Sequence, residues 1–385
     1  MKEVMVESSM PSKIRVGLIF GGRSGEHEVS LMSARGVMGA IDSDKYEIVP
    51  IGITKEGQWL ASGDPMVALT SGIMAKSNPA MLLAEPSQRG LMRLDEADQE
   101  QTLRAVQLTR LDVVFPILHG PYGEDGTVQG LLELAGVPYV GAGVTASAVG
   151  MDKVLFKDIL TARGLPVVPY LVIKRRAWER EPEATIDAIE SQIGYHCFVK
   201  PANLGSSVGI TKAHDRTELV AALDEAALYD RKLLVEVAID AREIEVSVLG
   251  NDDPIASLPG EILPCNEFYD YAAKYLDGDS ELLIPAPLPV ETTERVRSLA
   301  VEAYLAIDCA GMARADFLLD RHSGELYVNE LNTLPGFTPI SMYPKLWEAS
   351  GLSYTDLIDR LIELAFERHA DKSRSETTYR LPGKE

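Results

Sequence analysis

The sequence predicts an α/β protein of several domains, with a parallel sheet in its first ~140 residues. The chain has 385 residues, enough for two or three domains of ordinary size. Hydrophobic residues make up 46% and charged residues 25%, a balance that indicates globular domains and excludes a disordered or collagen-like chain. Short apolar runs also alternate with segments of helical spacing, and this alternation favours a parallel sheet.

A strand, a turn and a helix are predicted first. Residues 15–20 are apolar, Gly21 and Gly22 follow them, and residues 30–41 have helical spacing. Two further strand signals and one helical signal come later, at 46–53, 111–118 and 128–135. Between 61 and 105 the pattern is weak and polar, so we expect an insertion or a loose surface segment there. This α/β unit is expected to span residues 1–144.

Two more units and a tail are predicted, over 145–240, 241–370 and 371–385. The second unit is expected to open with a helix over 151–163, which Gly164 ends. Strands are expected at 167–173, 197–200, 244–249, 315–319 and 326–330, and a long helix at 354–368. The tail is charged and poor in apolar residues, so we expect it to be frayed.

Charge and cysteine content narrow the partners and the compartment. The net charge of −21 repels nucleic acids and anionic lipids, so a polyanionic ligand must be held by local cations or metal ions. Cys197, Cys265 and Cys309 lie far apart in sequence, which gives no zinc or disulfide pattern and indicates a reduced, cytosolic chain. The longest uncharged stretch, 134–151, contains glycines and a proline, which argues against a membrane helix. No secretory signal is recognised at the N-terminus.

A lysine and a loop of small residues predict a phosphate site. Lys200 ends a predicted strand, and residues 201–209 include enough glycine and serine for several N–H groups to face one anion. A plain hairpin is the alternative. The sequence contains no Walker pattern, which disfavours a P-loop enzyme. The lone Gly141-Ala142-Gly143 segment lacks an acidic residue about 20 positions on, so we interpret it as a turn between domains rather than a dinucleotide site.

Oxygen ligands on two predicted strands suggest a metal site. Glu330 and Asn332 are two residues apart, so they share one face of their strand. Asp316 lies on another strand, with Arg314 two residues before it on the same side. Two carboxylates and an amide suit Mg²⁺, a hard ion that prefers oxygen and binds beside phosphates. Each acidic residue alone could be a solvated charge, but the combination favours a site for an anion with a metal ion.

Seven segments of the chain form a set with a characteristic order. They are GGRSGEHEVS (21–30), HGPYGEDGTVQG (119–130), MDK (151–153), KPANLGSSVG (200–209), FYDYAAKY (268–275), GMARAD (311–316) and NELNTLPG (329–336). The set resembles the motifs of D-alanine–D-alanine ligases, which belong to the ATP-grasp superfamily. The resemblance implies a three-domain ATP-grasp architecture, α/β at the N-terminus and α+β in the ATP-grasp part. The N-terminal domain is then for substrate, 145–240 is the central ATP-grasp domain, and 241–370 is the C-terminal catalytic domain.

The resemblance implies a site for ATP with Mg²⁺ or Mn²⁺, two ions in the family. The implied nucleotide contacts are Lys153 and Lys200 at the phosphates, Gly205, Ser206 and Ser207 in the covering loop, Glu236 and the backbone of Val237 and Ile239 at adenine, Glu243 at the ribose, and Lys274 on a closing loop. The implied metal ligands are Asp316, Glu330 and Asn332, which agrees with their chemistry.

The family joins two D-alanine molecules, and the resemblance implies which residues do so here. ATP phosphorylates the carboxylate of the first molecule, and the amine of the second attacks the acyl phosphate. Glu26 is implied to pair with the first ammonium group, with His119 on a neighbouring loop of the same site. Ser206 is implied to link Glu26 to Tyr275, so that the loop of Tyr275 closes and excludes water.

Further implied contacts hold the reacting groups. Arg314 and the Gly336 N–H are implied to stabilise the tetrahedral oxyanion, and Ser341 and the Met342 N–H to hold the carboxylate of the second D-alanine. The resemblance also implies a cytoplasmic homodimer that makes peptidoglycan precursors.

Two alternatives remain open from the sequence. A D-alanine–D-lactate ligase has the same fold, but the resemblance implies that a tyrosine at position 275 goes with D-alanine as second substrate. A non-catalytic nucleotide-binding module needs the phosphate lysines but not Glu26, Arg314 and the Glu330/Asn332 pair together. All of these residues are present, which favours the dipeptide ligase.

Overall fold

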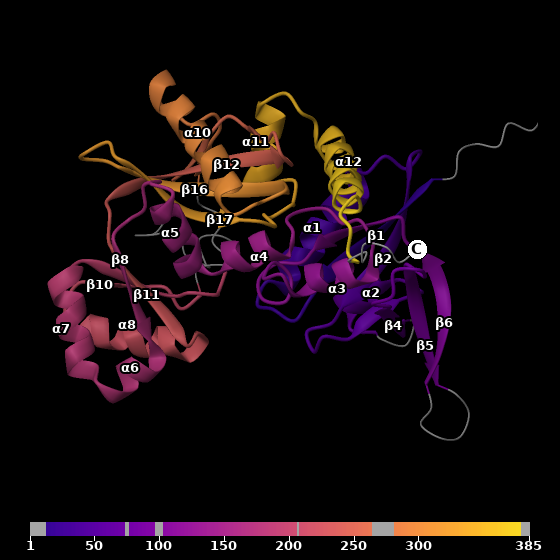
Figure 1. Cartoon of the computed structure of the whole chain (residues 1–385), viewed down its shortest axis with the longest axis horizontal. Coiled ribbons are helices and arrows are strands. Elements are labelled where there is room, and N and C mark those ends of the chain that lie inside the picture. Colours follow the sequence, from indigo (N-terminus) through magenta and orange to yellow (C-terminus); the bar gives the residue numbers. More distant parts are fainter. Residues whose placement is uncertain (1–12, 74–76, 97–102, 206–207, 264–280, 379–385) are drawn as a thin grey trace, which may run out of the picture.

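The computed structural model describes residues 13–73, 77–96, 103–205, 208–263 and 281–378, and its strands form three sheets surrounded by helices (Figure 1). The first sheet has seven strands in the order β6-β5-β4-β3-β2-β1-β7. β1 (Ile14–Gly21) pairs in parallel with β2 (Tyr46–Ile53) and with β7 (Val113–Ile117). The parallel sheet that the sequence predicts is therefore confirmed for these three strands.

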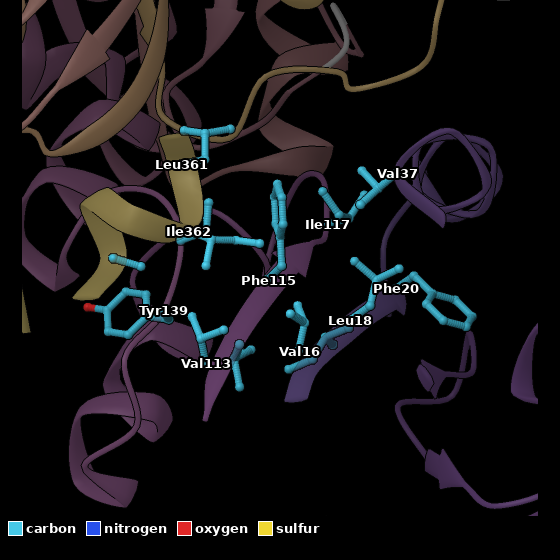
Figure 2. Packing of buried hydrophobic residues seen from close by; sticks show 14 of the residues in the cluster. Val16, Leu18, Phe20, Val37, Val113, Phe115, Ile117, Tyr139, Leu361 and Ile362 are labelled. Atoms are coloured by element: carbon cyan, nitrogen blue, oxygen red, sulfur yellow. The ribbon is translucent and has the colours of Figure 1, made fainter. Parts of the chain in front are cut away.

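Helices from both ends of the chain cover this first sheet. They are α1 (His27–Ala40), α3 (Thr127–Ala135) and α12 (Tyr354–Lys372). In Figure 2, Leu361 and Ile362 of α12 lie beside Phe115 of β7, and all three side chains are fully buried. The C-terminal helix therefore shares one core with the N-terminal sheet, although most of the third unit lies elsewhere.

The segment expected to be an insertion or a loose surface segment is formed, over its described residues, by regular elements. They are β3 (Trp59–Ala61), α2 (Pro65–Ser71), β4 (Asn78–Leu82), β5 (Gly90–Glu96) and β6 (Leu103–Arg110). These strands extend the first sheet in antiparallel fashion, so the sheet is mixed rather than wholly parallel. In β4 only Ala80 and Leu82 are buried, so the strand lacks the continuous apolar run that marks β1.

A four-stranded antiparallel sheet, in the order β10-β9-β11-β8, forms the middle of the chain. Its elements are β8 (Tyr170–Lys174), α6 (Arg175–Arg180), α7 (Pro182–Gln192), β9 (Cys197–Pro201), β10 (Thr211–Ala213), α8 (Arg216–Tyr229) and β11 (Lys232–Val237). Ile189 of α7 and Leu223 of α8 bury their side chains in the core under this sheet. Leu234 of β11, which alternates with residues of this core, packs in a smaller apolar cluster with Val154 and Ala202.

The third sheet follows the order β15-β14-β12-β16-β17, with β13 paired to β12. Its elements are β12 (Ala241–Gly250), β13 (Ile255–Ala256), β14 (Gly260–Leu263), β15 (Glu281–Leu283), α10 (Val290–Ala306), β16 (Gly311–Asp320), β17 (Leu326–Asn332) and α11 (Met342–Ala349). α10 packs its buried stripe against one face of the sheet. Across the described residues, each helix is too short or too polar to cross a bilayer.

The helix expected over 151–163 is present, and a second helix that the sequence does not predict comes directly before it. α4 (Val144–Met151) ends at Asp152, and α5 (Lys153–Ala162) begins directly after it. Asp152 has extended backbone, and its carboxylate accepts hydrogen bonds from the N–H groups of Val154 and Leu155. The cap therefore starts α5 within two residues of the predicted start of the helix. α4 consists mainly of small residues without an apolar stripe, so periodicity does not reveal it.

Candidate functional site

Two adjoining cavities of about 550 and 670 Å³ contain most of the predicted site residues. The smaller cavity is lined by loops of the first unit and by the third sheet. The larger cavity lies between the second and third sheets. Among the described residues, four line both cavities and form what we call the shared wall: Lys153, Ile210, Glu245 and Glu330. A group bound in one cavity can therefore meet a group bound in the other at this wall.

Three neighbouring strands carry the charged side chains at the shared wall. In the antiparallel register, Glu245 of β12 lies opposite Asp316 of β16, and Asp316 lies opposite Glu330 of β17. Two residues before Asp316 on the same strand, Arg314 lies opposite Asn332. The intervening residues on β16 are buried in the core, so the alternation places the polar side chains on the other face. The shared face predicted for the oxygen ligands is confirmed.

Arg314 is held by two carboxylates. Its Nε and Nη2 atoms donate to the two oxygens of Asp316, both at 2.7 Å, and Nε lies 3.0 Å from Oε2 of Glu245. Burial lowers the pKa of Arg314, but the charges of Asp316 and Glu245 outweigh burial and hold that pKa well above its ordinary value. Glu245 is missing from the predicted site. Its signal was a charged residue inside the apolar run 244–249.

The predicted metal ligands form a donor set that fits a hard cation. The Asn332 amide donates from Nδ2 to Asp316 at 2.9 Å, so its carbonyl oxygen can serve as a ligand. Within the described residues no three histidine, cysteine, aspartate or glutamate side chains are grouped as a metal site, and the predicted set has two carboxylates and an amide. A cation at Asp316 must share that carboxylate with Arg314. The chemistry of the three groups fits Mg²⁺ or Mn²⁺.

Lys153 joins the shared wall to the predicted phosphate loop. Its Nζ atom lies 3.3 Å from Oε2 of Glu330 and donates to the carbonyl oxygen of Leu204 at 2.9 Å. Leu204 and Gly205 line the smaller cavity directly after β9. The loop therefore leaves the second sheet beside the shared wall, as a phosphate cover requires. Four other predicted residues, Ser206, Ser207, Lys274 and Tyr275, lie outside the described residues.

A buried ion triad fixes the second phosphate lysine. Glu236 on β11 lies 2.7 Å from Nζ of Lys157 and 2.5 Å from Nζ of Lys200. Burial raises the pKa of Glu236, but the two lysines outweigh burial and lower it to about 2. Lys157 is missing from the predicted site. Its signal was a lysine on the same helical stripe as the buried residues Val154 and Leu160.

The residues expected around adenine line the larger cavity. The side chain of Glu236 points at the two lysines, so any contact of this residue with a base must use its backbone. The Val237 N–H already donates to the carbonyl oxygen of Pro169 at 3.2 Å, which leaves the Val237 carbonyl as its available backbone group. Ile239 and Glu243 also line the cavity wall. The contacts expected at adenine would therefore be made by backbone groups of Glu236 and Val237, and at Val237 by the carbonyl oxygen.

Glu26 reaches the smaller cavity from the residue before α1, and two glycines make room for it. A Cβ atom on Gly120 would lie 2.8 Å from Oε2 of Glu26, and one on Gly205 would lie 2.9 Å from the same oxygen. Both distances are shorter than real contacts of Cβ atoms. The carboxylate therefore sits between the loop after β7 and the loop after β9, which belong to different units.

His119 lines the same cavity with both ring nitrogens bonded to protein atoms. Nδ1 lies 3.1 Å from the Leu334 carbonyl oxygen, and Nε2 lies 3.2 Å from Oγ of Ser33. A carbonyl oxygen only accepts, so Nδ1 carries the proton and Nε2 accepts from the serine. Burial is the main cause that lowers the pKa of His119. A neutral His119 thus ties α1 to the loop that contains Gly336.

The last predicted residues lie around the start of α11. Ser341 precedes the helix, and its Oγ accepts from the Thr338 N–H at 3.0 Å. Met342 is the first helical residue, so its N–H has no partner within the helix. Gly336, Ser341 and Met342 all line the smaller cavity. The positive end of α11 therefore faces this cavity and suits a carboxylate.

Comparison with known proteins is consistent with this geometry over nearly the whole chain. Residues 15–142 match the family described as "D-ala D-ala ligase N-terminus", and residues 159–363 match "D-ala D-ala ligase C-terminus". A D-alanine–D-alanine ligase of Heliobacterium modesticaldum is 51% identical over 370 residues, covering 96% of this chain and 99% of the relative. One of Thermoanaerobacter pseudethanolicus is 55% identical over 364 residues, covering 94% and 99%.

Solved structures with the same fold include two ligases. The D-alanine–D-alanine ligase of Coxiella burnetii has a TM-score of 0.80 at 36% identity and covers 94% of this chain and 96% of its own. The VanG D-Ala:D-Ser ligase of Enterococcus faecalis also has a TM-score of 0.80 at 36% identity, covering 92% and 100%.

Proposed function

Because the chain belongs to the D-alanine–D-alanine ligase family, we propose that its two adjoining cavities divide the substrates of this reaction between them. The chain is an ATP-dependent ligase that joins two D-alanine molecules. ATP occupies the larger cavity, and the two amino acids occupy the smaller one. The observation that carries this proposal is the shared wall, because a carboxylate and a terminal phosphate can meet there.

In the larger cavity the nucleotide lies along the second sheet. Lys153 and Lys200 bind its phosphates, and the loop of Gly205, Ser206 and Ser207 covers them. The Glu236 carbonyl, the Val237 carbonyl and Ile239 face adenine, and Glu243 binds the ribose. Lys157 supports this site indirectly, because it supplies a second positive charge to Glu236 and so keeps Lys200 from being fully neutralised. Local cations thus offset the net charge of −21.

In the smaller cavity Glu26 pairs with the ammonium group of the first D-alanine. The carboxylate of that D-alanine points to the shared wall. A carboxylate oxygen attacks the γ-phosphorus, ADP leaves, and an acyl phosphate forms. The amine of the second D-alanine then attacks the carbonyl carbon, and inorganic phosphate leaves with the oxygen that it gained. Arg314 and the Gly336 N–H stabilise the tetrahedral oxyanion that forms when the amine attacks and lasts until phosphate leaves. Ser341 and the Met342 N–H hold the carboxylate of the second D-alanine.

Asp316, Glu330 and Asn332 hold Mg²⁺ or Mn²⁺, with two ions as in the family. A divalent ion at this place supplies charge neutralisation for the phosphates. Arg314 keeps Glu245 as a carboxylate partner when Asp316 takes on a ligand role, because the two carboxylates flank the guanidinium on different strands.

The remaining expectations are proposals of the same kind. Ser206 links Glu26 to Tyr275 in a closing loop with Lys274, and Tyr275 goes with D-alanine rather than D-lactate as second substrate. The domains are 1–144, 145–240 and 241–370, followed by a tail. The protein acts as a homodimer in the cytoplasm, where it supplies peptidoglycan precursors.

A pair of variants tests the division between the cavities. Glu26→Ala should raise the KM for D-alanine by roughly 10- to 150-fold, the worth of a charge-assisted bond, and leave the Kd for ADP unchanged. Lys200→Met should do the reverse. Steady-state kinetics and calorimetric titration with ADP give the two numbers. If each variant weakened both substrates equally, the proposed division would be wrong.

A further inference from the structure

Glu124 is a half-buried glutamate in the smaller cavity that the proposed reaction does not use. It lies in the loop between β7 and α3, and its Oε1 atom accepts the Gly120 N–H at 2.6 Å. A Cβ atom on Gly205 would lie 3.9 Å from the same Oε1 atom and 2.9 Å from Oε2 of Glu26. Glu124 and Glu26 therefore approach one point in the cavity from two different loops.

Gly120 touches both carboxyl groups. Its N–H bonds to Glu124, and its Cα side faces Glu26, where a Cβ atom would lie 2.8 Å from Oε2. The φ angle of Gly120 is +75°, a left-handed conformation that other residues adopt at a cost. The loop backbone is thus shaped to bring a second carboxyl group up to Glu26.

In the part of the chain that the structure describes, the one cation found to act on Glu124 already has other contacts. Lys153 is the positive group that acts on Glu124, but its ammonium group already contacts Glu330 and the Leu204 carbonyl. Glu330 and Glu26 both repel a charge on Glu124. Burial first, and the charge of Glu26 second, raise the pKa of Glu124 well above its ordinary value. Two carboxylates that approach one point in a half-buried cavity repel each other when both are ionised.

We propose that Glu124 holds a proton and pairs with Glu26, so that the two carboxyl groups together present a single negative charge to the ammonium group of the first D-alanine. The inference rests on the placement of that substrate at Glu26 proposed above. The single negative charge of the pair then matches the single positive charge of the substrate's ammonium group. A neutral acid can bind through its oxygen or donate its proton in a hydrogen bond, whereas a second carboxylate would leave excess charge in the site after the substrate binds.

Three full-length variants test the proposal through kcat/KM for D-alanine. Glu124→Gln keeps the shape and the acceptor for the Gly120 N–H but is permanently neutral, so its kcat/KM should stay within about threefold of wild type. Glu124→Leu removes the polar group and should lose at least roughly tenfold. Glu26→Gln removes the charge and should lose a similar amount. Titration with ADP should give the same Kd for all three.

Thermal unfolding gives a second readout that does not depend on activity. In wild type the folded protein retains a proton on Glu124 that the unfolded chain gives up at its ordinary pKa. Folding is therefore penalised increasingly as pH rises above 4.5, the ordinary value. Glu124→Gln lacks this penalty. Its Tm minus that of wild type should become more positive between pH 5 and pH 8.

Four outcomes would overturn the proposal. If Glu124→Gln lost as much kcat/KM as Glu124→Leu, an ionised carboxylate would be required. If Glu124→Leu kept wild-type activity, Glu124 would have no role in the site. A Tm difference that became more negative with rising pH would mean that folded Glu124 is ionised. If Glu26→Gln alone were unimpaired, the substrate placement itself would fail, and the inference would fall with it.

Discussion

Single residues decide where the reactive groups of this ligase can lie. The carboxylate of Glu26 occupies space that a side chain on Gly120 or Gly205 would fill. Gly120 also needs its left-handed backbone, whereas Gly205 does not. Gly205 therefore offers a substitution that tests contact with Glu26 without adding backbone strain.

Gly205→Ala should push the Glu26 carboxylate away, because the new Cβ atom would lie 2.9 Å from Oε2. We expect the KM for D-alanine to rise by roughly tenfold, with the Tm nearly unchanged. Gly130→Ala is the matched control, since a Cβ atom there meets nothing within 4 Å. Equal KM values for the two variants would separate Gly205 from the substrate site.

The ion triad of Lys157, Glu236 and Lys200 makes a prediction about pH. The folded-state pKa of Glu236 is about 2, below its ordinary value of 4.5, so the ionised form stabilises the fold above pH 4.5 by about 3 kcal/mol, and this gain is lost as pH falls toward 2. Wild type should therefore have a higher Tm than Glu236→Gln at pH 6, and the difference should shrink toward pH 3. A difference independent of pH would show that Glu236 acts by packing alone.

At the level of single residues, sequence patterns predict the proposed metal ligands better than the residues that support the site. Asp316, Glu330 and Asn332 follow from spacing because strand alternation is local. Lys157, Glu245 and Glu124 do not, because each is buried by partners distant in sequence. The partner of Glu245, for example, lies on another strand almost 70 positions later, and only the register brings Arg314 to it.

Among the elements, strand pairing of β12, β16 and β17 builds the shared wall. Antiparallel register brings Glu245, Asp316 and Glu330 side by side, and Arg314 offsets part of their charge. Three acidic side chains in one row repel one another, so each needs a cationic partner. The Arg314 guanidinium pairs with two of them, Glu245 and Asp316, and Lys153 pairs with Glu330.

Glu245→Gln should loosen Arg314, because Oε2 of Glu245 lies 3.0 Å from the Nε atom that also donates to Asp316. We expect kcat to fall by roughly tenfold, while the KM for ATP changes by less than about threefold. In an Arg314→Ala background the same substitution should have little further effect, because its action passes through the guanidinium. Glu302→Gln, at a half-exposed ion pair of α10, is the control. Additive losses in kcat would show that Glu245 acts independently of Arg314.

Strands that are buried along their length can be predicted from their apolar runs. Strands with only part of their residues buried, and short helices that are set by an N-cap, lack such a signal. The continuous apolar runs of β1, β2 and β7 mark them clearly, and β2 has the predicted bounds, Tyr46–Ile53. β4 and its antiparallel neighbours lack such runs, so the pattern resembles a loop. α4 consists of small residues, and the Asp152 cap that separates it from α5 depends on backbone geometry that periodicity does not show.

Across the whole molecule, an acidic protein must bind an acidic nucleotide. The net charge of −21 opposes ATP, and four cations among the described residues line the larger cavity: Lys153, Lys200, Lys212 and Arg321. Lys153 and Lys200 already contact carboxylates, so the proposed divalent ions would complete the neutralisation. The packing of α12 on the first sheet then ties the end of the third unit to the substrate side.

Asp316→Asn should weaken divalent ion binding in the presence of ADP by roughly tenfold, as measured by the free Mn²⁺ signal in electron paramagnetic resonance. Turnover should also fall, and excess chelator should abolish it in wild type. Asp253→Asn, in the exposed turn after β12, is the control. Unchanged Mn²⁺ affinity in Asp316→Asn would move the metal site elsewhere.

The long-range arrangement of the cavities is the part that local patterns cannot give. Periodicity predicts strands and helices one at a time, but the shared wall needs Lys153, from a helix, to meet Glu330, 177 positions later. The order of motifs bridges this gap only through resemblance to a family. The neutral His119 ring likewise forms hydrogen bonds through both of its nitrogens, to Ser33 and to Leu334. No sequence spacing connects these three residues.

The central claim is that a D-alanine carboxylate meets the terminal phosphate of ATP at the shared wall, and oxygen transfer tests it most directly. D-alanine labelled with ¹⁸O in both carboxylate oxygens is incubated with the enzyme and ATP, and the products are analysed by mass spectrometry. The account predicts D-alanyl-D-alanine, ADP, and inorganic phosphate that contains one ¹⁸O atom for each peptide bond formed. Inorganic phosphate without ¹⁸O, or ¹⁸O in AMP, would contradict it.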